Sequence, residues 1–265
     1  MSPSPRRYGL TPAEQKAYEE DGFFLRASVF RPDEIDAMRE ASEEVVAQAE
    51  VSGRAGRDYR IDGNRYAEGA SETIQYEHNE AAETIRVIEP FHHLHAIFER
   101  LIDDPRIVDP MCGVIGTDRV AVWTDKINLK RPREGSGFRW HQDSPYWTHA
   151  CDHVDLLPNV LVSLDDADDE NGCFQVVRGS HRRGCLPGIQ DDTTLGVLFT
   201  DPDHFEVADR VPARVPAGSL VFFSPHSVHG SEPNVSDRPR RAMVLTYQPS
   251  GNRMFKVDAM RNAGT

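Results

Sequence analysis

The second half of the chain is a succession of short β-favouring runs with no long helical pattern between them. Turns rich in glycine, proline and aspartate separate the runs, which are Val120–Trp123, Ile127–Leu129, Val160–Val162, Phe174–Val177, Leu220–Phe223 and Met243–Tyr247. β-Branched and aromatic residues in runs of this length are typical of strands. Parallel strands need long crossover connections, usually helices, so this pattern argues against repeated β-α-β winding. We expect an antiparallel, mainly β fold here.

The first half predicts helices instead. Thr11, Pro12 and Glu14 have the types and spacing of a helix start, with Glu14 reaching back to the cap. Apolar residues then recur at helical spacing in three further segments, residues 32–49, 90–103 and 105–115, and a short strand is expected at residues 23–25. Helices first and antiparallel strands later indicate an α+β organisation. Between residues 51 and 64 the pattern dissolves into glycine, arginine and aspartate, which predicts a mobile loop and a candidate lid.

Length and charge limit the function classes. A chain of 265 residues is long enough to bury a sizeable core, and we expect one domain over residues 1–265. A net charge of −13 argues against nucleic acid or an anionic membrane as the main partner, and favours a small molecule. No apolar run approaches the roughly 20 residues of a membrane span, and the first residues lack a secretory signal, so we expect a cytoplasmic protein. The four cysteines lack paired spacing, which leaves nitrogen and oxygen ligands for any metal.

A candidate metal site begins with His141 and Asp143. In an extended chain, side chains at i and i+2 leave the same face, so both residues can reach one ion. The segment Ser224–Ser231 supplies a second histidine, either His226 or His229. Two histidines and one carboxylate form the facial ligand set of non-heme Fe(II) oxygenases, which leaves coordination positions open.

The sequence around these residues resembles the phytanoyl-CoA dioxygenase family of Fe(II)/2-oxoglutarate oxygenases. The resemblance rests on Trp140–Asp143, Glu170–Gly172, Arg178–His181, and His229–Ser231 with Arg240 eleven residues after His229. Thr11–Gln15 and Asp21–Phe24 also look like the family's opening helix and strand. The resemblance implies a double-stranded β-helix, a cupin-like jelly-roll core, over about residues 117–250. The helical part, about residues 1–116, would pack on its outside. Residues 50–90 carry no motif of the family.

The resemblance also assigns roles within the site. It favours His229 over His226 as the third metal ligand, beside His141 and Asp143. Arg240 would bind the distal carboxylate of 2-oxoglutarate, with Ser231 and Asn128 as further cosubstrate contacts. Arg240 shares a face with the apolar residues that follow it if a strand begins there. The alternatives are a solvated basic cluster around Arg240 and a structural role for Asn128.

Aromatic residues next to the motif are candidates for the substrate pocket. The resemblance points to Trp147, joined by Tyr146 or Trp140, although a core role is as plausible for each. His181 is interpreted as a structural hydrogen-bonding residue. His92 and His95 show no partner carboxylate at a suitable spacing and are interpreted as surface or packing histidines. Basic residues that would suit a coenzyme A thioester are Arg131, Arg133, Arg139, Arg178, Arg182 and Arg183.

The function that the resemblance implies is hydroxylation of an unactivated C–H bond in a small metabolite or natural product. Fe(II) would be bound as the cofactor, 2-oxoglutarate and O2 would be consumed as cosubstrates, and succinate and CO2 would be released. Asp143 disfavours halogenation, because halogenating relatives carry a small residue there. Desaturation, epoxidation, oxidative ring closure and a cupin-like metal enzyme without 2-oxoglutarate are the alternatives. We expect a monomer or small homo-oligomer, and the sequence does not identify the substrate.

Overall fold

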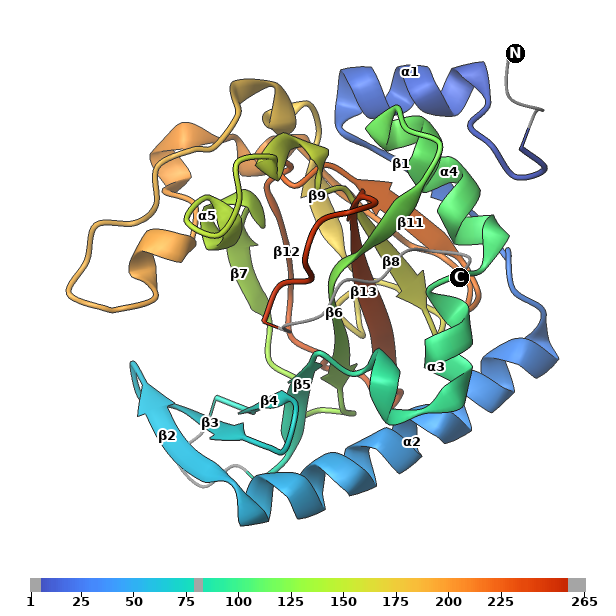
Figure 1. The fold of residues 1–265 in the computed structure, drawn as a ribbon. Coiled ribbons are helices and arrows are strands. Elements are labelled where there is room, and N and C mark those ends of the chain that lie inside the picture. The colour runs from blue at the N-terminus through green and yellow to red at the C-terminus, as the bar shows by residue number, and fades with distance from the viewer. Residues whose placement is uncertain (1–5, 79–82, 257–265) are drawn as a thin grey trace.

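Two antiparallel sheets dominate the protein, whose structure is a computed structural model describing residues 6–78 and 83–256. The larger sheet has nine strands in the order β1-β11-β8-β13-β6-β5-β4-β3-β2, and the smaller has four in the order β10-β9-β12-β7 (Figure 1). Each described pair of neighbours runs antiparallel, and for the strands from β6 onward this confirms the prediction from the sequence. This is a jelly-roll core, extended at one edge of the larger sheet.

The strand bounds show how the larger sheet is assembled from distant parts of the chain. In chain order its strands are β1 (Phe23–Arg26), β2 (Arg57–Ile61), β3 (Asn64–Glu68), β4 (Thr73–Tyr76), β5 (Ile85–Glu89), β6 (Val120–Lys130), β8 (Asn159–Ser163), β11 (Leu220–Phe223) and β13 (Arg240–Pro249). The smaller sheet contains β7 (Phe138–His141), β9 (Gln175–Val177), β10 (Arg210–Pro212) and β12 (His229–Ser231). The longest pairing joins β6 to β13 at the centre of the larger sheet.

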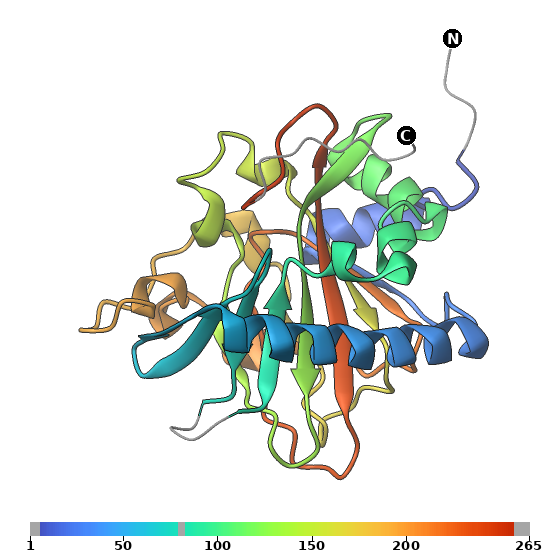
Figure 2. The same ribbon diagram turned by 60° about the horizontal axis from the view of Figure 1, so that its bottom comes forward.

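The helices lie outside the sheets. They are α1 (Pro12–Asp21), α2 (Pro32–Ala55), α3 (Ala96–Leu101), α4 (Pro105–Ile115) and the single turn α5 (Ser144–Trp147). The predicted capping box at Thr11 is present, because the Thr11 hydroxyl accepts from the Glu14 N–H and the Glu14 carboxylate accepts from the Thr11 N–H. Figure 2 shows α2 crossing the strands of the larger sheet.

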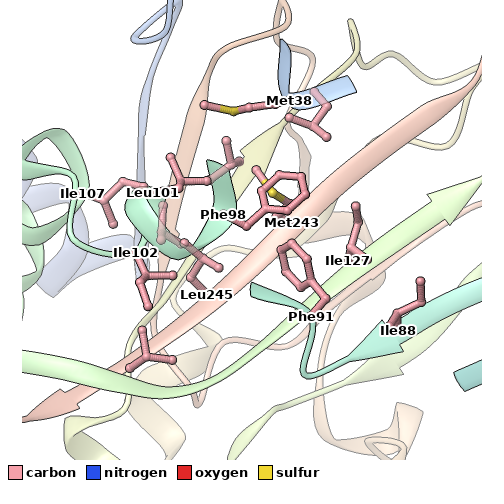
Figure 3. Close-up of a cluster of buried hydrophobic side chains, with 14 of the residues drawn as sticks. Met38, Ile88, Phe91, Phe98, Leu101, Ile102, Ile107, Ile127, Met243 and Leu245 are labelled. Atoms are coloured by element: carbon pink, nitrogen blue, oxygen red, sulfur yellow. The ribbon is translucent and has the colours of Figure 1, made fainter. Parts of the chain in front are cut away.

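The main apolar core fills the space between these helices and the larger sheet. Met38 of α2, Phe98 of α3 and Ile107 of α4 pack with Met243 and Leu245 of β13 (Figure 3). Phe98, Ile107, Met243 and Leu245 have no exposed surface. This packing leaves the opposite face of β13 and β6 free to form the wall of an internal site.

The predicted loop over residues 51–64 is wrong. Helix α2 continues to Ala55, and the chain then forms the β2–β3 hairpin, in which Tyr59 pairs with Tyr66 and their rings stack. Asp62 and Gly63 form the turn with positive φ angles of 50° and 81°. Those angles at both central residues suit the twist of a two-residue hairpin, and Asp-Gly is a frequent sequence for it.

Two other predicted elements need correction. The helix expected over residues 90–103 is divided into a 3-10 turn, His92–Leu94, and α3. The two runs predicted around Asp125 form the single strand β6. The same contact explains both errors: the buried Asp125 carboxylate accepts from the N–H groups of Phe91 and His92, at 2.8 and 2.9 Å. A charged residue inside an apolar run thus marks a long-range contact and not a turn.

Replacing Phe98 by alanine tests the packing of α3 on the sheet. Because Phe98 is fully buried, we expect Phe98→Ala to lower the free energy of unfolding by about 3–5 kcal/mol. Val51→Ala, at a position that is 62% exposed, is the control and should change it by less than about 0.5 kcal/mol. Urea unfolding followed by circular dichroism measures both. Equal effects would contradict this packing.

Candidate active site

Pairing between β7 and β12 brings the two predicted histidines together. In this pair His229 lies directly opposite His141, and their ring centroids are 4.1 Å apart. Asp143 follows β7 by two residues, and its Oδ2 lies 3.7 Å from Nε2 of His229. Ligand atoms of all three residues lie within 4.8 Å of one another. Side chains 88 residues apart in sequence therefore meet as one group with the composition of a facial triad.

Backbone carbonyl groups orient both imidazoles. Nδ1 of His141 donates to the carbonyl of Arg139 at 2.7 Å, and Nδ1 of His229 donates to that of Ser227 at 2.9 Å. Because Nδ1 carries the proton in each ring, Nε2 is left as the lone-pair donor. Such hydrogen bonds set the tautomer of metal-binding histidines.

Electrostatics hold the three side chains in metal-binding protonation states. Burial, followed by the proximity of His229, lowers the pKa of His141 to about 3, and burial also lowers the pKa of His229. Burial by itself would raise the pKa of Asp143, but Lys126 and the two histidines bring it below its ordinary value. At neutral pH the site thus presents two neutral imidazoles and a carboxylate, the forms that bind a cation.

Two side chains orient the Asp143 carboxylate. Asn159 of β8 donates to Oδ2 at 3.0 Å, and Nζ of Lys126 on β6 lies 3.4 Å from Oδ1. The backbone N–H of Asp143 donates to the carbonyl of Pro225 at 3.1 Å. The larger sheet therefore supplies both side chains that hold this carboxylate, and the loop before β12 holds its backbone.

An inner cavity lies between the triad and Arg240. It holds about 40 Å³, and His141, His229, Asn128, Ser231 and Arg240 line it. Arg240 is the first residue of β13, so it shares its face with Val244, which also lines the cavity. The structure thus brings all three predicted cosubstrate residues to one cavity, Asn128 and Arg240 from the larger sheet and Ser231 from the smaller one.

Arg240 is buried and retains its charge. Its guanidinium donates to the Gly172 carbonyl at 2.7 and 3.1 Å and to the Ser231 hydroxyl at 3.4 Å. Burial lowers its pKa to about 10, which still leaves a cation at neutral pH. This excludes the solvated basic cluster for Arg240, whereas Arg238 is exposed and paired with Asp168. Asn128 is also buried, and its Oδ1 accepts no hydrogen bond from the described part of the chain.

A larger outer cavity opens on the other side of the triad. It has a volume of about 470 Å³ and shares Lys126, Asn128, Phe138 and His141 with the inner cavity. Much of its remaining wall is aromatic: Tyr59, Tyr66, Tyr146, Trp147, Phe199 and Phe255. Tyr146 and Trp147 thus lie where the resemblance implies, and Trp147 also packs on Trp123 and Leu157.

Other histidines lie apart from the triad. His226 contacts the Ser144 hydroxyl at 2.9 Å and the Asp155 carboxylate at 2.7 Å, and His181 donates to the Glu19 carbonyl at 3.1 Å. The interpretation that His92 and His95 lack partner carboxylates is wrong. Nδ1 of His92 lies 2.6 Å from Oδ2 of Asp125, and Nε2 of His95 lies 3.4 Å from Oε2 of Glu44, because folding joins distant segments.

The candidate basic residues are divided between the cavity and the surface. Arg139 lines the outer cavity, with its guanidinium 4.1 Å from the Phe199 ring centroid. Three others form ion pairs elsewhere: Arg131 with Glu43, Arg133 with Asp237 and Arg178 with Asp21.

Three residues of the site were not among the predicted site residues: Lys126, Asn159 and Arg86. Lys126 lies two residues before Asn128, so alternation along a strand was a usable signal for it. Arg86 also carried a signal in the sequence, because it interrupts the apolar run Ile85–Ile88. The structure buries it, with 3% of the residue exposed. Asn159 had none, since only the pairing of β8 with β13 brings it near Asp143.

The fold and the triad together define a metal-dependent oxygenase of jelly-roll architecture. Residues 18–242 match the family model of phytanoyl-CoA dioxygenase (PhyH). The chain therefore belongs to the phytanoyl-CoA dioxygenase family.

Curated relatives and solved structures agree with this membership. The chain is 29% identical to ectoine dioxygenase of Halomonas elongata over 92% of its length and 71% of the relative. It is 29% identical to L-proline trans-4-hydroxylase of Streptomyces griseoviridis over 63% of its length and 69% of the relative. Among structures, EctD from S. alaskensis with 2-oxoglutarate and 5-hydroxyectoine superposes with a TM-score of 0.70 at 21% identity, covering 95% of this chain and 83% of that one. The α-ketoglutarate-dependent carbocyclase SnoK of nogalamycin biosynthesis superposes with a TM-score of 0.68 at 22% identity, covering 94% of this chain and 88% of that one.

These findings confirm the predicted family, the jelly-roll fold, the oxygenase class, and the requirement for Fe(II), 2-oxoglutarate and O2. They leave open the substrate and the reaction catalysed on it. Among the described residues, no helix is long and apolar enough to cross a membrane.

Substituting the two candidate histidines distinguishes ligand from neighbour. We expect His229→Ala to weaken Mn(II) binding, measured anaerobically by calorimetry, at least about 100-fold, because one of three protein ligands is lost. His226→Ala is the matched control and should bind Mn(II) like the parent protein, since its ring contacts Ser144 and Asp155. The reverse order of effects would make His226 the ligand.

Proposed function

We propose that the protein is an Fe(II)/2-oxoglutarate-dependent dioxygenase that hydroxylates an unactivated C–H bond of a small metabolite or natural product. The observation that carries the proposal is a His141–Asp143–His229 triad placed between two cavities of different size. Three protein ligands leave the other coordination positions for a cosubstrate and O2. Succinate and CO2 are the co-products.

Arg240 is the proposed anchor of 2-oxoglutarate in the inner cavity. Its buried guanidinium lines this cavity, and paired charge-assisted hydrogen bonds from it suit a carboxylate. The Ser231 hydroxyl beside it and the unpartnered Oδ1 of Asn128 supply further polar contacts. Because Arg240, His141 and His229 line the same cavity, a 2-oxoglutarate held by Arg240 would have its keto acid within reach of the metal site.

When bound, Fe(II) with 2-oxoglutarate and O2 supplies the oxidising chemistry, and the protein supplies position and exclusion of water. His141 and His229 donate Nε2 lone pairs, and Asp143 donates a carboxylate oxygen. Lys126 and Asn159 hold that carboxylate in place. Orientation of metal ligands by neighbouring hydrogen bonds is a common determinant of metal affinity.

The outer cavity is the proposed substrate site. Its volume of about 470 Å³ falls within the range of about 300–1,000 Å³ for small-molecule pockets. Tyr146 and Trp147 line it beside the triad. Ectoine dioxygenase and L-proline trans-4-hydroxylase are named for small molecules of this size class. Desaturation, epoxidation and ring closure need the same cavity, and product analysis distinguishes them from hydroxylation.

Two segments that line the outer cavity are joined to each other. Asp62, at the turn of the β2–β3 hairpin, accepts hydrogen bonds from the backbone N–H groups of Thr194 and Leu195, at 2.8 and 2.7 Å. The hairpin contributes Tyr59 and Ile61 to the cavity wall, and the other segment contributes Leu195. The segment that was expected to be a loop and candidate lid is therefore a hairpin tied to a second segment, and we propose that the two together form the lid.

Loss of the Arg240 guanidinium tests the cosubstrate site. We expect Arg240→Met to raise the Kd of 2-oxoglutarate about 10- to 100-fold, because that factor corresponds to the free energy of a hydrogen bond to a charged group. Anaerobic titration of the Fe(II) protein with 2-oxoglutarate, followed by the visible charge-transfer band of the chelate, measures this Kd. Arg238→Met, at an exposed arginine in the same segment, is the control and should leave it unchanged. Equal Kd values for both variants would place the distal carboxylate elsewhere.

A substrate screen tests the reaction itself. We expect succinate release above the uncoupled background with at least one small-molecule substrate, and a product heavier by one oxygen atom in mass spectrometry. A protein that binds iron but shows neither the charge-transfer band nor 2-oxoglutarate consumption would favour the cupin-like alternative.

A further inference from the structure

Arg86 is a buried cation in the wall of the outer cavity. It lies on β5, is 3% exposed, and lines the cavity together with Tyr66, Phe138 and Tyr146. Its guanidinium carbon lies 4.0 Å from the centroid of the Phe138 ring. Arginine is rarely buried without a paired anion, so its partners are informative.

The partners of Arg86 are neutral. Nη2 donates to the Gly137 carbonyl at 2.7 Å, and Nη1 contacts the His78 ring, 3.0 Å from Nδ1. Burial, followed by Arg86 itself, lowers the pKa of His78 to about 4, so this imidazole is uncharged at neutral pH. Nε finds no acceptor within the described part of the chain.

Burial lowers the pKa of Arg86 from its high ordinary value, and Glu77 is the first of the groups that oppose the shift. The buried Glu77 carboxylate accepts from Ser136 through Oε2, and its Oε1 has no hydrogen-bond partner in the described part of the chain. Glu77 acts on Arg86 through its charge, without an ion pair between the two among the described residues. A guanidinium remains protonated in proteins. Arg86 is therefore a desolvated positive charge that the described residues do not pair.

Neighbouring lysines have other partners or are neutral. Lys126 lies against Asp143, and Lys256 pairs with Glu89. Lys130 donates to the carbonyls of Gly172 and Glu232, and burial, followed by Arg240, lowers its pKa to about 5, so its amine is neutral. In the proposed function, the distal carboxylate of 2-oxoglutarate neutralises Arg240. Its other carboxylate and Asp143 would neutralise a divalent metal, and Lys126 would then share Asp143 with the metal, while Glu89 also raises the pKa of Lys126 against the effect of burial. Among the described residues, no carboxylate forms an ion pair with Arg86.

We propose that Arg86 binds the anionic group of the substrate, and that the substrate is an organic acid whose carboxylate is attached to a flat, apolar body. This rests on the proposed function and adds a substrate class to it. The guanidinium donates to the carboxylate, and the rings of Tyr66, Phe138 and Tyr146 pack against the body. Arg86 lines the outer cavity and is not among the residues that line the inner cavity. This favours the substrate over 2-oxoglutarate as the missing anion.

Matched acid and amide probes test this proposal. The protein is loaded with Ni(II) and 2-oxoglutarate, so that the inner cavity is occupied and no turnover occurs. Calorimetry then compares trans-cinnamate with cinnamamide, indole-3-acetate with its amide, and 4-hydroxybenzoate with its amide. We expect at least one acid to bind about tenfold or more tightly than its amide, since a charged hydrogen bond is lost in the amide.

Variants test whether the preference for the acid over the amide depends on the Arg86 side chain. Arg86→Met should abolish the acid preference, and Arg86→Lys should restore part of it. Arg133→Met removes an exposed arginine paired with Asp237 and should leave it intact. Thermal unfolding checks that each variant folds, and Arg86→Gln replaces Arg86→Met if the latter does not.

Three outcomes would overturn the proposal. One is the absence of any acid preference in the parent protein, and another is an unchanged preference in the variant without the guanidinium. The third is a weaker charge-transfer titration with 2-oxoglutarate in Arg86→Met while the preference persists, which would assign Arg86 to the cosubstrate. Because that titration reports the metal and 2-oxoglutarate directly, failure of this inference is distinguishable from failure of the proposed function.

Discussion

The pairing of β7 with β12 is the interaction on which the site depends. It places His229 opposite His141, so two imidazoles distant in sequence face one point. A shift of one residue in this register would turn His229 to the other face of the strand and separate the ligands. The pairing is short and irregular, with a register shift between His229 and Ser231. Hydrogen bonds from the two Nδ1 atoms to backbone carbonyl groups then set the direction of each ring.

Around this pair of strands, buried charged side chains line the two cavities at different distances from the triad. Arg240 occupies the inner cavity, Asp143 and Lys126 lie at the boundary between the two cavities, and Arg86 lines the outer one. Each buried ionised group costs free energy unless an opposite charge or hydrogen bond compensates it. The interior therefore favours anions at two depths, although the chain as a whole is acidic. In the proposals made above, this contrast suits one anion at each depth, 2-oxoglutarate at Arg240 and the acid group of a substrate at Arg86.

Much of the fold and the core of the site were predictable from sequence, because they rest on local patterns. Turn-bounded β runs predicted the antiparallel sheets, the Thr11 capping box predicted the first helix, and the spacing of His141 and Asp143 predicted two members of the triad. Errors arose where tertiary contacts override local pattern. Asp125 lies inside a strand only because distant N–H groups bind it, and Asn159 reaches Asp143 only through sheet order. The β2–β3 hairpin was missed although Asp62 and Gly63 carried its turn signal.

The most direct test of the central claim is anomalous diffraction from a crystal grown anaerobically with Mn(II) and 2-oxoglutarate. We predict a single strong peak about 2.0–2.3 Å from Nε2 of His141, Nε2 of His229 and a carboxylate oxygen of Asp143, distances usual for nitrogen and oxygen ligands of divalent metals. We also predict that the distal carboxylate of 2-oxoglutarate lies on Arg240. A peak that omits His229, or imidazoles turned away from each other around a metal held elsewhere, would contradict the assignment.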